Sequence, residues 1–371
     1  MSGLEAAHYQ AMKLKVPAFI ESLHKSRREC LQRILQGMIA GLCVQIPQMA
    51  RFLGGPHRQE AAYKRVARFL AETPMDKVQI ARFVCQRLKL NRISKWTLVI
   101  DRTNWKYGKH HRNFLVLGVL FKNQCIPLIS TNLGDKRKCG NSNRSDRAEV
   151  LNIFTEAFPG QKVKVLLADR EFLGEGWFSD LNALSIDYIV RLKEGWHVVN
   201  ERANQRTLRI DAYVERQLKG HKKILSNHRV LLGANKPEVA FITAFKVGEE
   251  LFVLRHSQGV KQAHRQYKRR WKIETCFKNL KSAGVDLEST HLLNPTRLEN
   301  ICCIAVIATA LVYAQGPLVQ EKVKHHGAPQ HSLFRRCLDH LHWLITHCGY
   351  LFEELMPFKA PYLAGLHKNV R

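Results

Sequence analysis

The segment His264–Gly284, HRQYKRRWKIETCFKNLKSAG, has the residue spacing of an amphipathic helix that carries one carboxylate, Glu274, within a basic face. At 3.6 residues per turn, one narrow stripe of the helix surface holds Tyr267, Arg270, Glu274 and Lys281. The adjacent stripe is apolar and consists of Ile273, Phe277, Leu280 and Gly284. We therefore expect the apolar stripe to pack into a core and the polar stripe to border a cleft.

The four polar residues are spread along this helix. With a rise of about 1.5 Å per residue, Tyr267 and Lys281 lie roughly 10 Å to either side of Glu274. This layout suits a chain of phosphates, which the cations and the hydroxyl would bind while the carboxylate acts at one of them. The alternative is a solvated charged helix in which Arg270 and Glu274 form an ordinary i,i+4 ion pair, with a stabilisation of about 0.2–0.5 kcal/mol.

The spacing Tyr-x2-Arg-x3-Glu-x6-Lys is similar, without any departure, to the signature of the IS-four family of bacterial insertion-sequence transposases. The resemblance implies a DDE transposase with an α/β, RNase H-like core, in which Glu274 is the last member of an Asp-Asp-Glu metal-binding triad. It also implies Mg²⁺ as the cofactor, with Mn²⁺ able to substitute. Two aspartates, each at the end of a strand, should then lie upstream of Glu274.

Two strand-like segments upstream do end in an aspartate: Trp96–Asp101, WTLVID, and Val163–Asp169, VKVLLAD. Functional groups in an open mixed sheet gather at the carboxyl ends of strands and on the helix that covers them. Asp101, Asp169 and Glu274 can therefore converge, although a lone aspartate after a strand is usually a turn former or a helix cap. Three carboxylates suit two divalent ions, and we expect Asp101 to contact both of them.

The second aspartate belongs to Asp169-Arg170-Glu171-Phe172, which resembles the second Asp motif of the same family. Glu171 is an alternative ligand, but we expect it to cap the next helix. The other segments predict the order β-β-β-α-β-α-β of a mixed five-stranded sheet. Beyond the two aspartate strands, they are strands at 114–121, 125–133 and 188–192, a turn at 122–124, a helix capped by Ser145 and Asp146 that runs to Phe158, and a helix at 176–184.

The N-terminal part predicts a helix-turn-helix. A helix at 46–53 and a second one at 58–70 flank Gly54-Gly55-Pro56, the order of a DNA-binding module. The second helix carries cations beside a core stripe of Ala62, Val66 and Phe69; they are Arg58, Lys64, Arg65 and Arg68. A plain helical hairpin is the alternative, since short glycine-rich turns join many helix pairs.

Between the core strand and the signature segment, alternating stretches at 239–247 and 251–255 predict an inserted β-subdomain, which the family also has. In family members that form hairpin ends, a tryptophan of the insertion holds a flipped base. Trp196 is the candidate here, but it lies at the threshold of the insertion, and no tryptophan occurs between residues 197 and 270. Trp271, beside Arg270, is expected to be a packing residue.

Composition indicates a polyanionic partner. The net charge of +28, from 59 Lys and Arg against 31 Asp and Glu, favours nucleic acid over a membrane surface. Residues 1–18 lack the pattern of a signal peptide, and the apolar run 301–314 is short for a membrane span. Ten cysteines without a CxxC pair indicate a reduced, cytoplasmic protein. A segment with Cys337, His340, His342, His347 and Cys348 directs its side chains several ways, so no metal site is expected there.

These observations predict five regions: a helical DNA-binding domain (1–92), the first part of the core (93–194), the inserted β-rich subdomain (195–260), the last part of the core (261–314) and a helical C-terminal region (315–371). Two further helices are expected at 296–314 and 331–355. The resemblance implies a bacterial, nucleoid-associated transposase that cuts and rejoins double-stranded DNA as a homodimer or larger synaptic complex. A nuclease of the same fold and a non-catalytic DNA-binding protein are the alternatives.

Overall fold

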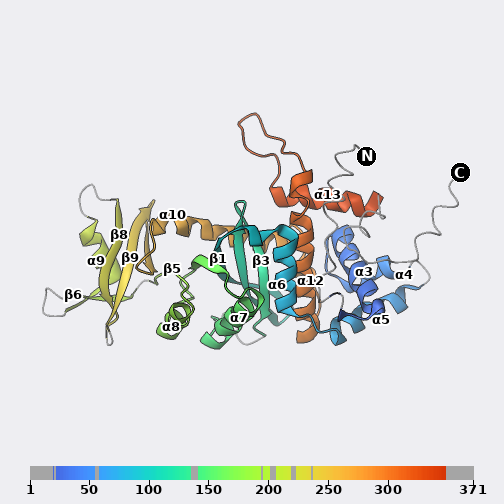
Figure 1. The fold of residues 1–371 in the computed structure, drawn as a ribbon, viewed down its shortest axis with the longest axis horizontal. Helices are drawn as coiled ribbons and strands as arrows, with labels where there is room; N and C mark the ends of the chain where they lie inside the picture. Colours follow the sequence, from blue (N-terminus) through green and yellow to red (C-terminus); the bar gives the residue numbers. More distant parts are fainter. Residues whose placement is uncertain are drawn as a thin grey trace.

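The computed structural model describes residues 20, 22–54, 58–134, 141–193, 195–200, 206–218, 223–234 and 237–347. Its strands form one ten-stranded sheet in the order β3-β2-β1-β4-β5-β10-β9-β8-β6-β7. Helices of the N-terminal part lie at one end of an elongated molecule, and the strands of the insertion lie at the opposite end (Figure 1). The signature segment lies between these ends, where it can reach both halves of the sheet.

The five predicted core strands make one half of the sheet, with β3 at its edge. Strand β1 pairs antiparallel with β2 and parallel with β4, while β2 pairs antiparallel with β3 and β4 pairs parallel with β5. Two helices connect the parallel strands, which completes the order expected of an RNase H-like core. The elements are β1 (Lys95–Tyr107), β2 (His110–Phe121), β3 (Gln124–Asn132), α7 (Arg144–Ala157), β4 (Lys162–Ala168), α8 (Glu175–Ala183) and β5 (Tyr188–Arg191).

The first strand is longer than predicted, so Asp101 does not end it. The parallel pairing with β4 stops at Ile100 and Ala168, but the antiparallel pairing with β2 continues to Tyr107 opposite His110. Asp101 therefore lies inside β1, at the point where one of its two neighbouring strands ends. Asp169 directly follows β4, as predicted. The two aspartates thus directly follow Ile100 and Ala168, the last paired residues of β1 and β4, and lie on neighbouring chain segments.

Local signals set the turns and caps of this core. Lys122 and Asn123 have φ values of 44° and 61°, the left-handed pair that a two-residue hairpin between β2 and β3 needs. Helix α7 begins earlier than predicted, because its N-cap is Asn143 rather than Ser145 or Asp146. Asn143 and Asp146 bond reciprocally to each other's backbone N–H in a capping box.

The insertion extends the same sheet. Strand β10 pairs antiparallel with β5 through Leu254 and Arg191, so the predicted β-subdomain is joined edge to edge to the core. A second apolar cluster, which includes Val214, Ile242 and Ala244, lies in this part. The strands expected at 239–247 and 251–255 are confirmed. The elements are β6 (His197–Asn200), β7 (Arg206–Arg209), α9 (Ile210–Gln217), β8 (Ile224–Leu232), β9 (Glu238–Val247) and β10 (Glu250–His256).

The N-terminal helices share one apolar cluster with the core sheet. Helix α6 contacts α7, β3 and α12, so the predicted boundary at residue 92 separates elements that pack together. The helices expected at 46–53 and 58–70 are present, and turn residues 55–57 lie outside the described ones. The helices are α3 (Lys25–Gly41), α4 (Ile46–Gly54), α5 (Gln59–Glu72) and α6 (Lys77–Leu88), followed by the 3-10 turn η2 (Leu90–Arg92).

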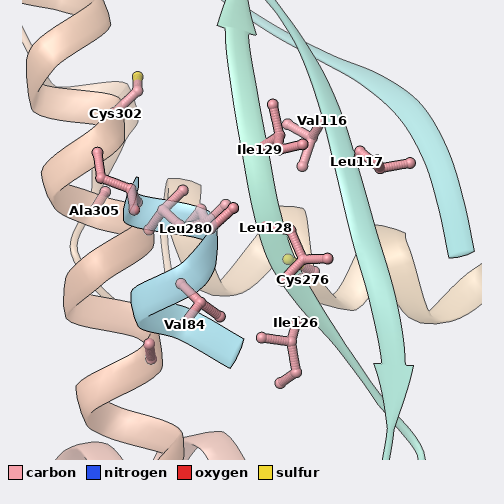
Figure 2. Packing of buried hydrophobic residues seen from close by; sticks show 14 of the residues in the cluster. Val84, Val116, Leu117, Ile126, Leu128, Ile129, Cys276, Leu280, Cys302 and Ala305 are labelled. Carbon is pink, nitrogen blue, oxygen red and sulfur yellow. The ribbon is translucent and has the colours of Figure 1, made fainter. Parts of the chain in front are cut away.

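Helix α12 (Pro295–Tyr313) is the apolar centre of this cluster. It contacts β3, α5, α6 and α13 (Leu333–His347), and Figure 2 shows Cys302 and Ala305 of this helix among side chains of neighbouring elements. The segment Pro295–Leu318, which adds the turn η5 (Gly316–Leu318), is long and apolar enough to cross a membrane, unlike the shorter run we expected. Its most apolar stretch is 78% buried inside the fold, which is typical of a core helix.

Candidate active site

The signature segment is helical but interrupted. Instead of one continuous helix, it forms α10 (Ala263–Lys268), a 3-10 turn η3 (Arg269–Trp271) and α11 (Lys272–Lys281). The N–H of Lys272 bonds to the carbonyls of Arg269 and Arg270, which tightens the winding at this point. Apolar residues of α11 are buried as predicted, including Ile273 and Leu280.

Arg270 links two of the three predicted catalytic acids. Its Nη1 donates to Asp101 Oδ2 at 2.8 Å, and its Nη2 donates to Glu274 Oε1 at 2.9 Å. The i,i+4 pair with Glu274 exists, but the Arg270 side chain is only 11% exposed and also reaches a strand far away in the sequence. The solvated-helix alternative is therefore wrong, because the polar stripe packs against the edge of the sheet.

Tyr267 reaches the third acid. Its hydroxyl donates to Asp169 Oδ1 at 3.3 Å, and the side chain is buried. Burial raises the pKa of the Tyr267 phenol well above its ordinary value, so the group stays a hydrogen-bond donor at neutral pH. Together, Tyr267 and Arg270 bring the signature segment, with its own Glu274, into contact with Asp101 and Asp169.

The carboxyl of Asp101 is the most perturbed acid of the site. Its pKa is raised from 3.8 to about 6, mainly by burial and also by the negative charges of Asp169 and Glu171, against the opposing effects of Arg270 and of the backbone N–H of Arg102. That N–H donates to Asp101 Oδ1 at 2.8 Å. A positive charge placed next to this buried carboxyl stabilises its ionised form.

Lys281 lies at the other end of α11 and bonds within the protein. Its Nζ is 2.9 Å from the carbonyl oxygen of Asn104 and 2.8 Å from Glu288 Oε1, and its side chain is 23% exposed. The Lys281 ammonium thus ties α11 to β1 beyond Asp101. A partly exposed ammonium in this position retains N–H donors for a phosphate.

The donor chemistry of the three acids fits a hard divalent cation, since all three are carboxylates. Arg270 holds a positive charge between Asp101 and Glu274, which shows that these two carboxylates accept a shared cation. In the described part of the chain, however, no group of three or more His, Cys, Asp or Glu side chains is arranged to hold a metal ion.

Glu171 does not cap the helix after Asp169, contrary to our expectation. Helix α8 begins after Gly174 and has no side-chain cap. The Glu171 carboxylate instead accepts hydrogen bonds from Arg102 Nε at 3.1 Å and from the backbone and hydroxyl of Ser142 at 3.1 and 2.9 Å. Sequence reasoning missed Arg102 and Ser142, because no local pattern marks partners so far apart along the chain.

The two tryptophans of the prediction behave differently. Trp271 is 64% exposed, so the expectation that it packs into the core is wrong. Trp271 lies in the 3-10 turn η3, none of whose residues is buried. Trp196 is half-buried and packs against the apolar cluster of the insertion, and its base-stacking role stays a prediction.

The predicted DNA-binding cations of α5 are exposed and border a groove between α3 and α5. The groove has a volume of about 550 Å³, and its lining includes Arg27, Lys64, Arg65 and Arg68. Lys64 pairs with Glu60 at 2.6 Å, and Arg65 donates to the carbonyl oxygen of Ser26 at 2.9 Å. Arg58 lies just before α5 and is exposed.

The Cys and His residues of α13 do not converge. Cys337 is buried, whereas His342 contacts the carbonyl oxygen of Ala40 and His347 stacks on Trp343. His340 lies on the same helix, and Cys348 lies outside the described residues.

A mixed sheet with two aspartates on adjacent strands, facing a glutamate on a covering helix, is the arrangement of an RNase H-like phosphoryl-transfer core. Residues 93–311 match the family model described as the transposase DDE domain, and the chain belongs to this family. Membership confirms the predicted class of protein, a DDE transposase, and this family generally uses divalent metal ions. The narrower IS-four assignment stays a prediction.

Two solved structures show looser similarity. One is the piggyBac transposase synaptic complex with hairpin DNA, at 10% identity and a TM-score of 0.43 over 96% of this chain and 78% of that chain. The other is the catalytic domain of human Endonuclease V, at 13% identity and a TM-score of 0.28 over 69% of this chain and 98% of that chain. No curated protein matches this chain.

Proposed function

We propose that this transposase binds the ends of a mobile DNA element and catalyses metal-dependent strand cleavage followed by strand transfer, in a cut-and-paste reaction. The observation that carries the proposal is the contact of the signature segment, which contains Glu274, with both aspartates. Arg270 bonds to Asp101 and Glu274, and Tyr267 bonds to Asp169. Residues of the signature and both aspartate segments therefore lie together at one place on the sheet edge.

The reaction needs no covalent bond to a side chain. In the first step, water attacks a phosphorus atom at the element end, and the bond to the 3′ oxygen breaks to leave a 3′-hydroxyl and a 5′-phosphate. In the second step, that 3′-hydroxyl attacks a phosphodiester of the target and displaces its 3′ oxygen. One site suffices for both steps, because only the attacking oxygen differs.

Asp101, Asp169 and Glu274 would hold Mg²⁺, or Mn²⁺ in its place, with Asp101 shared between two ions. Such ions activate the attacking oxygen and stabilise the leaving one. The protein's own cations position the DNA: Arg270 and Lys281, with the Tyr267 hydroxyl, would bind phosphates on either side of the scissile bond. Once Arg270 bonds to a phosphate, Asp101 and Glu274 become free to share another cation.

Binding of the element end is assigned to the N-terminal helices. The exposed cations Arg58, Lys64, Arg65 and Arg68 lie on or beside α5, next to the groove between α3 and α5. Phosphate contacts of this kind position a protein on DNA without reading its sequence. Because cut-and-paste chemistry joins two ends to one target, we further propose that the protein acts as a homodimer or a larger complex on DNA.

The test separates binding from cleavage. Wild type, Asp169→Asn and Glu274→Gln are incubated with a DNA fragment that carries the presumed element end, in Mg²⁺ or in EDTA. We expect all three proteins to bind the fragment and only wild type with Mg²⁺ to cut it at the end. Cleavage at random positions would favour a nuclease, and binding without cleavage under any metal would favour a non-catalytic DNA-binding protein.

A further inference from the structure

A largely buried ion pair joins residues that follow the two predicted catalytic aspartates. Arg102 comes directly after Asp101 in β1, and Glu171 comes two residues after Asp169. The Arg102 Nε donates to Glu171 Oε2 at 3.1 Å, and the two side chains are only 13% and 15% exposed. An ion pair this far from solvent is screened much less than one on the surface.

On the β1 side, the backbone of Arg102 bonds to the Asp101 carboxylate, and the Arg102 side chain is held from β2. The backbone N–H donates to Asp101 Oδ1, while Nη1 of the side chain donates to Asn113 Oδ1 at 3.1 Å. Asn113 lies two residues along β2 from Leu115, the cross-strand partner of Arg102, so both side chains lie on one face of the sheet. Asp101 points to the opposite face, as successive residues of a strand do.

On the β4 side, Glu171 is held by α7. Its Oε1 accepts both bonds from Ser142, and Arg147 donates to the Ser142 hydroxyl at 3.0 Å and to the Glu171 carbonyl oxygen at 2.9 Å. The turn itself is closed by the bond from the Phe172 N–H to the Asp169 carbonyl oxygen at 3.0 Å. Both carboxylate oxygens of Glu171 are therefore engaged, which does not suit a metal ligand.

We propose that Glu171 and Arg102 are positioning residues of the active site, whose ion pair fixes the Asp101 carboxylate relative to Asp169. Neither side chain touches the reacting atoms. The pair crosses from β1 to the turn after β4 at the place where the pairing between these strands has ended. It thus replaces the missing ladder hydrogen bonds next to the two acids, and it rests on the proposed function of those acids.

The expected effect is a weaker response to metal. Glu171→Gln keeps the shape and loses the charge, and partners that orient metal ligands typically change metal affinity or activity by about 10–100-fold when replaced. We expect the Mg²⁺ concentration for half-maximal cleavage to rise by about 10-fold or more in Glu171→Gln and Arg102→Gln. Because the two residues act through one ion pair, the double variant should lose no more than the worse single variant.

Two further measurements separate positioning from a general structural role. The affinity for the end fragment should stay close to wild type in Glu171→Gln. Because loss of the Glu171 charge leaves the Arg102 guanidinium without its partner, the melting temperature in EDTA should fall, and cleavage is compared well below that temperature. Asp180→Asn is the matched control, since it removes an Arg144–Asp180 ion pair between α7 and α8 that does not adjoin the catalytic acids. This variant should keep the wild-type Mg²⁺ response.

The outcomes are distinguishable from failure of the proposed function, which would show as no end cleavage by wild type or as cleavage by Asp169→Asn. The positioning role is overturned if Glu171→Gln keeps the wild-type Mg²⁺ response, or if the losses of the two single variants multiply in the double variant. It is also overturned if the loss of cleavage is fully explained by the fraction of protein that is unfolded at the assay temperature. Complete loss of cleavage in Mn²⁺ as well as Mg²⁺, with folding intact, would instead make Glu171 a ligand.

Discussion

Replacing Asp101 with asparagine should stabilise the metal-free protein at neutral pH. Burial raises the pKa of Asp101 from 3.8 to about 6, so the folded state binds a proton that the unfolded state has already lost. Below pH 4 the carboxyl is neutral in both states. As pH rises through about 6, the folded state loses this advantage, and the free energy of unfolding falls by up to about 3 kcal/mol, since each pKa unit corresponds to about 1.4 kcal/mol.

Asparagine is neutral at every pH, so the free energy of unfolding of Asp101→Asn does not fall as this carboxyl ionises. Its amide N–H₂ faces Arg270 less favourably than a carboxylate does, and we therefore expect a net gain of roughly 1–3 kcal/mol at pH 8 that shrinks toward zero near pH 4. Thermal unfolding in EDTA across this pH range measures it, with Glu156→Gln as an exposed-carboxylate control. A variant that is less stable than wild type at pH 8, or a difference independent of pH, would refute the reasoning.

Three further substitutions test the packing. Gly37→Ala should lower the free energy of unfolding by about 1–3 kcal/mol, because a Cβ at this position would lie 2.7 Å from the backbone of α4. An unchanged melting temperature would contradict this close approach. Glu299→Ala should lower the free energy of unfolding by roughly 2–4 kcal/mol, because the mostly buried Lys77 ammonium loses the carboxylate now at 2.5 Å. Chemical denaturation measures this loss, and a smaller value would show that the pair contributes little. Trp271→Ala should change stability by less than about 0.5 kcal/mol, since the ring is 64% exposed; a larger loss would mean that the ring packs.

The order of strands and helices in the core was predicted well where local signals and the resemblance agreed. Asp169 was found because an apolar strand ends directly before it. The end of β1 was misplaced because the strand continues as one arm of a hairpin with β2. Thr103 and Trp105 are buried in this arm, and the apolar pattern of residues 96–101 does not predict that burial. The family signature located Glu274, although its helix is broken by a 3-10 turn that 3.6-residue periodicity does not report.

What the sequence left out depends on contacts between distant segments. Arg102 and Glu171 are separated by 69 residues, so only the pairing of β1 with β4 brings them together. The join between β5 and β10 is equally non-local, which is why the insertion was predicted as a separate subdomain. Trp271 was predicted to pack because tryptophan is usually buried. It is instead exposed in the tight turn η3, which the residue type does not predict.

The most direct test of the account is metal rescue at the three acids. Asp101, Asp169 and Glu274 are each replaced by cysteine, and end cleavage is measured in Mg²⁺ and in Mn²⁺, which accepts sulfur ligands more readily. We predict no cleavage in Mg²⁺ and partial recovery in Mn²⁺ for these three variants, with wild-type cleavage in both metals for Glu156→Cys. Cleavage in Mg²⁺ by any of the three variants would contradict the assignment of that residue as a metal-binding catalytic acid.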